Sequence, residues 1–274
     1  MVKRENPAER KVTSLPVRSA DELASHRSWL VYGRSGSGKT TFAGSFPGPI
    51  LFLDVADKGT DSIAGLKDCK IMELKVWDDF EMVYWYLKDH EGEYATVVVD
   101  TVTQLQQFAI QRVLDNKGKD SERAGDWGTM TKKEWGDVAS MMKSWITNFR
   151  DLPMEVIFIA QDRTFNADEE SMSQTDVLMP EVGPRLSPSV ATHLNASVSV
   201  IGNTYIREKI IKKEVKKSGF KKPKQEEKSV YQYCMRVGPN PIYITKLRKP
   251  RNIEPPSFVV DPTYSDIVDI IKGE

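Results

Sequence analysis

The amino-acid sequence predicts an α/β protein with a mainly parallel central sheet that is flanked by helices. Two observations support this prediction. Short apolar runs recur along the first part of the chain, and segments with helical periodicity separate them. Such runs are typical of strands buried on both faces, and their alternation with helices indicates a parallel sheet. We expect these strands at residues 29–32, 50–54, 71–74, 96–100 and 156–161.

The helices and the remaining strands follow in order. A glycine-rich loop after the first run leads into a short helix, which ends near the proline and glycine residues at 47–49. Asp78 or Asp79 is expected to cap a helix that runs to residue 87, because short polar side chains accept hydrogen bonds from the first turn. Further helices are expected at 101–114, 132–150 and 189–194, and strands near 196–201, 230–237 and 242–247 form a β-rich C-terminal extension of the sheet.

Length and composition indicate a water-soluble globular protein. The chain has 274 residues, of which 39% are hydrophobic and 28% are charged, and this suits one large domain or two small ones. Because no apolar run is long enough to span a membrane and the charged N-terminus is unlike a signal peptide, we expect a cytoplasmic protein without membrane contacts. We expect a flexible N-terminal tail at 1–25, one domain at 26–260 and a C-terminal tail at 261–274.

Positive charge is concentrated between residues 207 and 228. This segment holds ten Lys and Arg residues against four Glu, a net charge of +6, and because the whole chain is neutral the remainder carries −6. A basic insertion of this kind is compatible with contacts to nucleic-acid phosphates. It is equally compatible with a solvated loop whose lysines keep the protein soluble, so both interpretations stay open.

The most specific motif is a phosphate-binding loop. Residues 33–40 match the pattern G-x-x-x-x-G-K-[ST] in full, between a predicted strand and a predicted helix. The glycines allow successive N–H groups to point at one phosphate, while Lys39 reaches the β- and γ-phosphates and the Thr40 hydroxyl ligates Mg²⁺. The motif predicts a bound polyphosphate and Mg²⁺, held by Gly33, Arg34, Ser35, Gly36, Ser37, Gly38, Lys39, Thr40 and Thr41.

Polar residues at the carboxyl ends of the predicted strands complete the expected site, since open α/β sheets bind ligands at that edge. Asp100 ends a buried strand and is the expected partner of Thr40 in holding the metal ion. Hydrolysis also needs a group that orients the attacking water, and Asp54 and Asp57 are the two candidates. Gln161 ends the strand that follows Asp100 in the sequence and is expected to sense the γ-phosphate through its amide.

Taken together, five segments resemble the ATPase core of RecA-type recombinases, and in particular the short RecA-like nucleotide-binding and single-strand annealing proteins of bacteriophages. The segments are residues 33–40, 52–54, 97–101, 158–161 and 245–248, within a likeness that covers residues 28–260. This resemblance implies a RecA-like P-loop NTPase core, single-stranded DNA as a partner, and assembly of identical subunits into a filament or ring. A single-stranded DNA-binding protein is a further partner that it implies, and the host cytosol would be the location of a phage-encoded protein.

The resemblance also assigns roles to individual residues. Gln161 would couple the γ-phosphate to DNA, residues 116–131 and 163–186 would take the places of two DNA-binding loops, and Lys246 and Arg248 would reach the ATP of a neighbouring subunit. The sequence departs from the family at Ala56, where the recombinases carry a catalytic glutamate. Asp57 would have to replace it with a shorter side chain, which implies slow hydrolysis.

Three functional hypotheses follow. The first is an ATP- and Mg²⁺-dependent ATPase that binds single-stranded DNA, with Trp127 and Phe165 as stacking residues, and promotes annealing or strand exchange. The second is a nucleotide or small-molecule kinase, because the same loop occurs in those enzymes. The third is an ATP-gated interaction protein with little hydrolysis, a reading that Ala56 supports.

Overall fold

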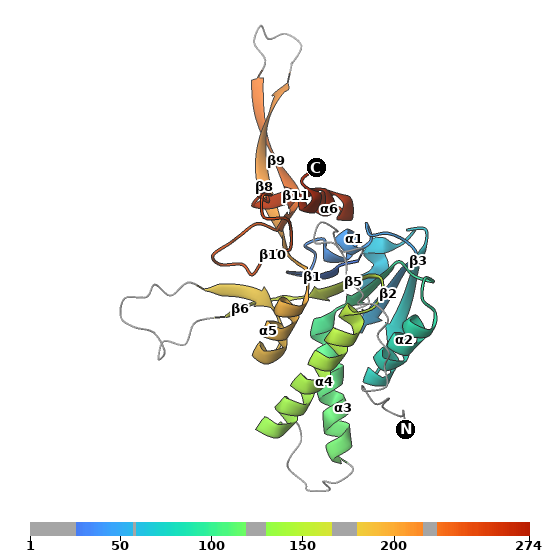
Figure 1. Ribbon diagram of the computed structural model, residues 1–274. Helices are drawn as coiled ribbons and strands as arrows, with labels where there is room; N and C mark the ends of the chain where they lie inside the picture. Colours follow the sequence, from blue (N-terminus) through green and yellow to red (C-terminus); the bar gives the residue numbers. More distant parts are fainter. Residues whose placement is uncertain (1–25, 57–58, 119–129, 166–179, 216–223) are drawn as a thin grey trace, which may run out of the picture.

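A computed structural model describes residues 26–56, 59–118, 130–165, 180–215 and 224–274 of the chain (Figure 1). Its strands are β1 (Ser28–Gly33), β2 (Ile50–Val55), β3 (Cys69–Leu74), β4 (Thr96–Asp100), β5 (Glu155–Ala160), β6 (Asp162–Phe165), β7 (Glu181–Pro184), β8 (Val200–Val215), β9 (Lys224–Arg236), β10 (Lys246–Leu247) and β11 (Phe258–Val260). Its helices are α1 (Lys39–Ala43), α2 (Trp77–Asp89), α3 (Val102–Gly118), α4 (Lys132–Arg150), α5 (Pro188–Ser197) and α6 (Tyr264–Lys272), and η2 (Gly59–Ile63) is a 3-10 turn.

The predicted α/β fold class is confirmed. A nine-stranded sheet has the order β11-β9-β8-β1-β5-β4-β2-β3, with β10 paired to β8, while β6 and β7 form a separate two-stranded ribbon. The pairs from β3 to β8 across the centre of the sheet are parallel, and β9, β10 and β11 pair in antiparallel fashion at one side. The C-terminal part of the chain therefore extends the sheet with strands, as the sequence predicts.

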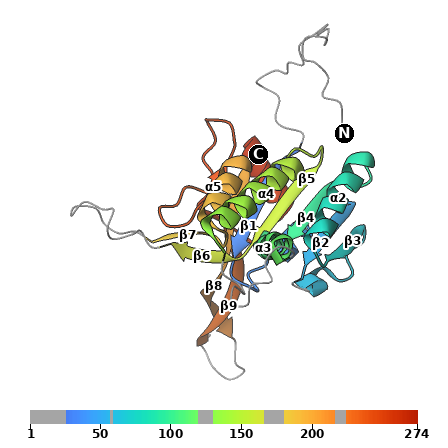
Figure 2. The same ribbon diagram turned by 90° about the horizontal axis from the view of Figure 1, so that it is seen from below.

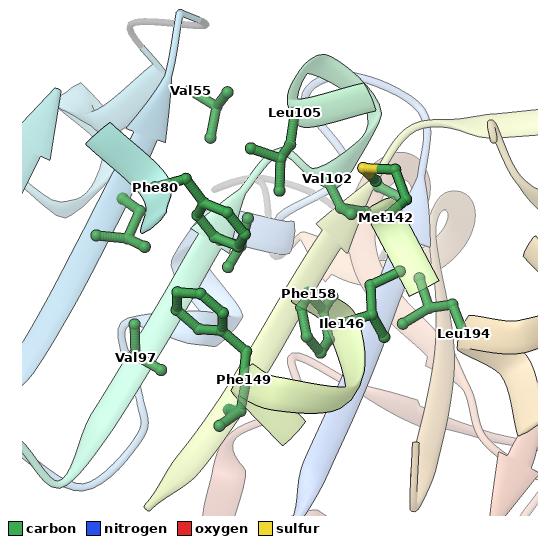
Figure 3. Packing of buried hydrophobic residues seen from close by; sticks show 14 of the residues in the cluster. Val55, Phe80, Val97, Val102, Leu105, Met142, Ile146, Phe149, Phe158 and Leu194 are labelled. Atoms are coloured by element: carbon green, nitrogen blue, oxygen red, sulfur yellow. The ribbon is translucent and has the colours of Figure 1, made fainter. Parts of the chain in front are cut away.

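Two apolar cores, one on each face, explain why the central strands are continuous apolar runs. On one face, α2, α3, α4 and α5 cover the sheet, as the view from below shows (Figure 2). There Phe80 of α2 stacks on Phe149 of α4 with ring centroids 4.2 Å apart, and Leu105 and Met142 belong to the same core (Figure 3). On the other face, α1 and α6 pack against alternate residues of the same strands. Successive side chains of a strand point to opposite faces, so each central strand contributes apolar residues to both cores.

The C-terminal segment is not a tail, which corrects our prediction for residues 261–274. Helix α6 begins at a capping box, in which the Thr263 hydroxyl accepts a hydrogen bond from the Asp266 N–H and the Asp266 carboxylate accepts one from the Thr263 N–H. Its residues Ile267, Val268 and Ile271 are buried in the core with α1. The side chains at this spacing share one helix face, so α6 closes that side of the sheet.

Much of the basic segment is a β-ribbon. Strands β8 and β9 pair from Asn203 with Arg236 to Val215 with Lys224, and the ribbon projects from the body of the molecule (Figure 1). The interpretation of 207–228 as a solvated loop is therefore wrong for the residues within these strands. The helix expected at 189–194 extends to Ser197, the strand expected near 196–201 begins only at Val200, and the one expected at 242–247 is limited to β10.

Candidate nucleotide-binding site

The phosphate loop connects the end of β1 to the start of α1, as its sequence predicts. Gly36 and Gly38 have φ angles of 75° and 89°, in the left-handed region that favours glycine. Gly33 lies against β8, since a Cβ atom at this position would be 2.3 Å from the main-chain oxygen of Thr204. These glycines allow the loop to fold tightly beside the neighbouring strand.

Lys39 lies within the loop and is only 8% exposed. Its Nζ donates hydrogen bonds to the main-chain oxygens of Gly33 and Arg34, at 2.9 and 2.8 Å. The Ser37 hydroxyl donates to the oxygen of Arg34 at 2.7 Å and lies 2.7 Å from the Thr204 hydroxyl. The ammonium charge is therefore held among carbonyl dipoles at the place where the motif puts phosphate oxygens.

Thr40 and Asp100 are brought together from α1 and the end of β4. The Thr40 hydroxyl donates a 2.7 Å hydrogen bond to Oδ2 of Asp100, whose side chain is buried. A hydroxyl and a carboxylate oxygen at this separation are ligands of the kind that Mg²⁺ prefers beside a bound phosphate. The two residues therefore fit a magnesium ion, which would neutralise phosphate charge when bound.

A cavity of about 760 Å³ opens at this edge of the sheet. Its volume lies within the range of about 300–1,000 Å³ that is usual for ligand pockets. The walls combine the phosphate loop and the start of α1 with the ends of two strands and with C-terminal residues. They include residues 35–42, Ser45, Gly59, Ser62, Asp100, Thr101, Gln161, Thr204, Tyr233, Cys234 and residues 261–263.

Gln161 follows β5 and lies in the wall of this cavity, as expected from its place at a strand end. Its main-chain oxygen accepts a 2.7 Å hydrogen bond from the Arg185 N–H, and its Oε1 accepts a 3.2 Å hydrogen bond from Nη1 of Arg185. Its own N–H donates to the Thr103 hydroxyl at 3.1 Å. Gln161 therefore joins the cavity to the base of the β6–β7 ribbon.

Comparison with known families agrees with this geometry. The family model described as an AAA domain matches residues 25–249, which is most of the chain. The chain belongs to this AAA-domain family. It is thus a P-loop ATPase by family, with a mainly parallel sheet between helices.

More distant comparisons add little to the family assignment. Among solved structures, a KaiC-like protein, PH0186, from the hyperthermophilic archaeon Pyrococcus horikoshii OT3 is similar with 11% identity and a TM-score of 0.42. The alignment covers 86% of this chain and 89% of that one. No curated protein matches the sequence. The AAA-domain assignment therefore rests on the family model.

The two candidates for the water-orienting acid in this AAA domain have different positions. Asp54 is 4% exposed in β2, where it pairs in register with Asp100, but it is not among the residues that line the cavity. Asp57 lies outside the described residues. Ala56, at the position where the resemblance to RecA-type recombinases would place a glutamate, has a φ of 58°, which places the chain in a left-handed turn directly after β2.

Lys246 and Arg248 do not meet the phosphate loop of their own chain. Lys246 pairs with Ile201 near the start of β8, whereas the loop lies near Thr204 farther along that strand. The Nζ of Lys246 donates to the main-chain oxygens of Asn195 and Ala196, each at 2.9 Å, at the C-terminal end of α5. Burial and the neighbouring Arg248 lower the pKa of the Lys246 ammonium group. The two cations thus lie toward the amino ends of the parallel strands, away from the phosphate loop at the carboxyl ends.

Sequence reasoning missed the C-terminal wall of the cavity. Tyr233 of β9 and residues 261–263 line it, although they lie far from the phosphate loop in the sequence. The loops predicted at 116–131 and 163–186 are described only in part, because 119–129 and 166–179, with Trp127, lie outside the described residues. None of the helices in the described ranges is long and apolar enough to span a membrane.

Proposed function

We propose that this AAA-domain protein is an ATP- and Mg²⁺-dependent ATPase that binds single-stranded DNA, assembles with copies of itself, and promotes annealing or strand exchange as in phage recombination. The observation that carries the proposal is the pair of hydrogen bonds between Gln161 and Arg185. One partner lines the nucleotide cavity, and the other lines a second groove. A change at the γ-phosphate thereby has a direct route to a surface that suits DNA.

The chemistry of that second groove supports DNA as the partner. The groove has a volume of about 530 Å³ and is lined by Arg163, Arg185 and Trp135, together with glutamine and serine side chains. Trp135 is 44% exposed, and the Arg163 guanidinium lies 5.1 Å from the centre of the Phe165 ring. No acidic residue lines the groove among the described parts of the chain. Unopposed guanidinium groups attract phosphates, and an exposed indole can stack on a base.

The roles of the nucleotide-site residues follow from their chemistry. The loop N–H groups and Lys39 would hold the β- and γ-phosphates, and Thr40 and Asp100 would hold Mg²⁺. Gln161 would respond to the γ-phosphate with its amide. Lys246 and Arg248 lie toward the amino ends of the parallel strands, away from the phosphate loop, so they can act only on the ATP of another subunit.

This arrangement between subunits can be tested by mixing two inactive variants. Lys39→Ala removes ATP binding but leaves Lys246 in place, while Lys246→Ala does the reverse. If Lys246 acts across an interface, the mixture regains ATPase activity that neither variant has alone. If the mixture stays inactive although the two proteins assemble together, Lys246 has no such role.

The central experiment measures ATP hydrolysis with and without an oligothymidylate strand. The wild type is expected to be stimulated by the strand, and Arg185→Ala is expected to lose this stimulation because the link from Gln161 to the groove is cut. Arg251→Ala, which removes an exposed arginine elsewhere, is the matched control and should keep it. If the wild type binds ATP but neither binds nor responds to single-stranded DNA, the proposal is wrong.

One observation favours the alternative of an ATP-gated interaction protein with little hydrolysis. Ala56 provides no acid where the recombinases have their glutamate, and Asp54 is buried beside Asp100 rather than in the cavity wall. Measuring ADP release over many hours separates the two functions. Tight ATP binding and DNA capture without ADP release would support the gated protein.

A further inference from the structure

The cavity is larger than the phosphates require, and its remaining wall comes from the C-terminal part of the chain. Tyr233, Cys234 and residues 261–263 line the same cavity as the phosphate loop. This wall runs along α1: Tyr233 lies beside Gly38 at the start of the helix, and the Tyr264 N–H donates a 2.8 Å hydrogen bond to the Ser45 hydroxyl just past its end. A nucleoside attached to phosphates in the loop therefore meets this wall.

Tyr233 presents an aromatic ring to the cavity. A Cβ atom on Gly38 would lie 3.4 Å from Cδ1 of Tyr233, so the ring lies directly beside this part of the loop. The side chain is 46% exposed. Its main chain is fixed, because β9 pairs with β8 and because the Tyr233 oxygen accepts a 2.6 Å hydrogen bond from the Asp261 N–H. With the main chain fixed in this way, the exposed ring offers a face on which a flat ligand can stack.

Asp261 adds a hydrogen-bond acceptor to the same wall. It lies between β11 and α6 with a φ of 44°, and it lines the cavity. Within the described ranges its carboxylate accepts no hydrogen bond and joins no ion pair, whereas the neighbouring Thr263 hydroxyl is engaged in the cap of α6. An exposed carboxylate with free acceptor capacity suits the amino group of a nucleobase.

We propose that this wall is the nucleobase subsite, in which Tyr233 stacks on the base and Asp261 accepts a hydrogen bond from its exocyclic amino group. The inference rests on the proposed function only in that the phosphate loop binds a nucleoside triphosphate. The chemistry selects a base that carries an exocyclic amine, and adenine meets this requirement. A base without the amine keeps the stacking contact and loses the hydrogen bond.

The test compares three ligands by calorimetry in the presence of Mg²⁺: ATP, purine riboside triphosphate, which lacks the amine, and inorganic tripolyphosphate. Tyr233→Ala is expected to weaken ATP binding roughly thirtyfold, the middle of the range for base stacking on aromatic side chains. It should leave tripolyphosphate binding unchanged, and Tyr233→Phe should bind ATP as the wild type does. Asp261→Gly keeps the left-handed backbone accessible and should remove the preference for ATP over purine riboside triphosphate.

Tyr231→Ala is the matched control. Tyr231 lies two residues away on the same face of β9, is 68% exposed and does not line the cavity, so this variant should bind all three ligands normally. The subsite is refuted if Tyr233→Ala binds ATP like the wild type, if it loses tripolyphosphate to the same extent, or if the wild type binds no nucleotide. Normal ATP discrimination without any response to DNA would refute the DNA function and leave the subsite intact.

Discussion

Replacing Thr40 by valine tests the metal site with little change in side-chain shape. The substitution removes the hydroxyl that donates a 2.7 Å hydrogen bond to the Asp100 carboxylate, which is 6% exposed. A hydrogen bond to a charged group contributes about 1.5–3 kcal/mol, so we expect the free energy of unfolding without nucleotide to fall by about 2 kcal/mol. The same substitution removes the hydroxyl that is proposed to ligate Mg²⁺, so the part of the ATP affinity that depends on Mg²⁺ should disappear while the part due to the loop and Lys39 remains.

Both effects can be measured separately. Urea unfolding in the presence of a chelator gives the stability change, and calorimetry with and without Mg²⁺ gives the metal-dependent affinity. Thr96→Val is the control, since Thr96 lies at the other end of β4 and its hydroxyl donates to the Pro47 oxygen at 2.7 Å. It should cost about 1 kcal/mol of stability and keep the full effect of Mg²⁺. If Thr40→Val still gains affinity from Mg²⁺ as the wild type does, the assignment of the metal site is wrong.

Three further predictions concern the fold around the site. Gly33→Ala brings a Cβ to 2.3 Å from the Thr204 oxygen, so it should lower stability by about 3 kcal/mol and abolish ATP binding. Gly36→Ala places its Cβ in open space and should cost only about 1 kcal/mol of stability. Equal losses of stability for the two variants in urea unfolding would contradict this prediction. Phe149→Ala removes a fully buried ring and should cost about 3–5 kcal/mol, and a loss below about 1 kcal/mol would mean that the core is not packed as described. Burial raises the pKa of the Glu155 carboxyl. The contribution of the protonated carboxyl to the free energy of unfolding is therefore complete below the ordinary pKa of 4.5, and it is lost as the pH rises through the higher pKa of the folded protein. The stability of the wild type relative to Glu155→Gln should therefore increase as the pH falls from neutral, and a constant difference would exclude this effect.

Local signals explain the parts of the fold that the sequence predicts well. The helix expected at 132–150 has these limits in the structure, because Thr131 and Glu134 form a capping box directly before an amphipathic run. The phosphate loop and the acid at the end of β4 were also predicted, since their residue types and spacing carry the chemistry. A similar signal at Thr263 and Asp266 precedes α6, so this helix too has a start signal in the sequence.

Long-range pairing explains what the sequence does not reveal. Tyr233 enters the cavity because β9 pairs with β8, and Asp261 follows because β11 pairs with β9. Neither residue has a motif of its own, so local patterns could not place it near the phosphate loop. The density of lysines likewise hid the strands of the basic ribbon, in which exposed apolar residues such as Ile210 and Tyr231 favour strand structure.

In the proposed function, the strand order gives a nucleotide signal a route out of this site. Because β5 lies between β1 and β4, the residue that follows β5 emerges between the phosphate loop and Asp100. That residue is Gln161, and the chain continues from it directly into β6. Arg185 donates hydrogen bonds to both the main-chain oxygen and the side-chain amide oxygen of Gln161. The Gln161 amide therefore cannot turn toward a γ-phosphate unless it gives up the Arg185 guanidinium or draws it along, and either outcome changes the charge presented in the groove beside Trp135.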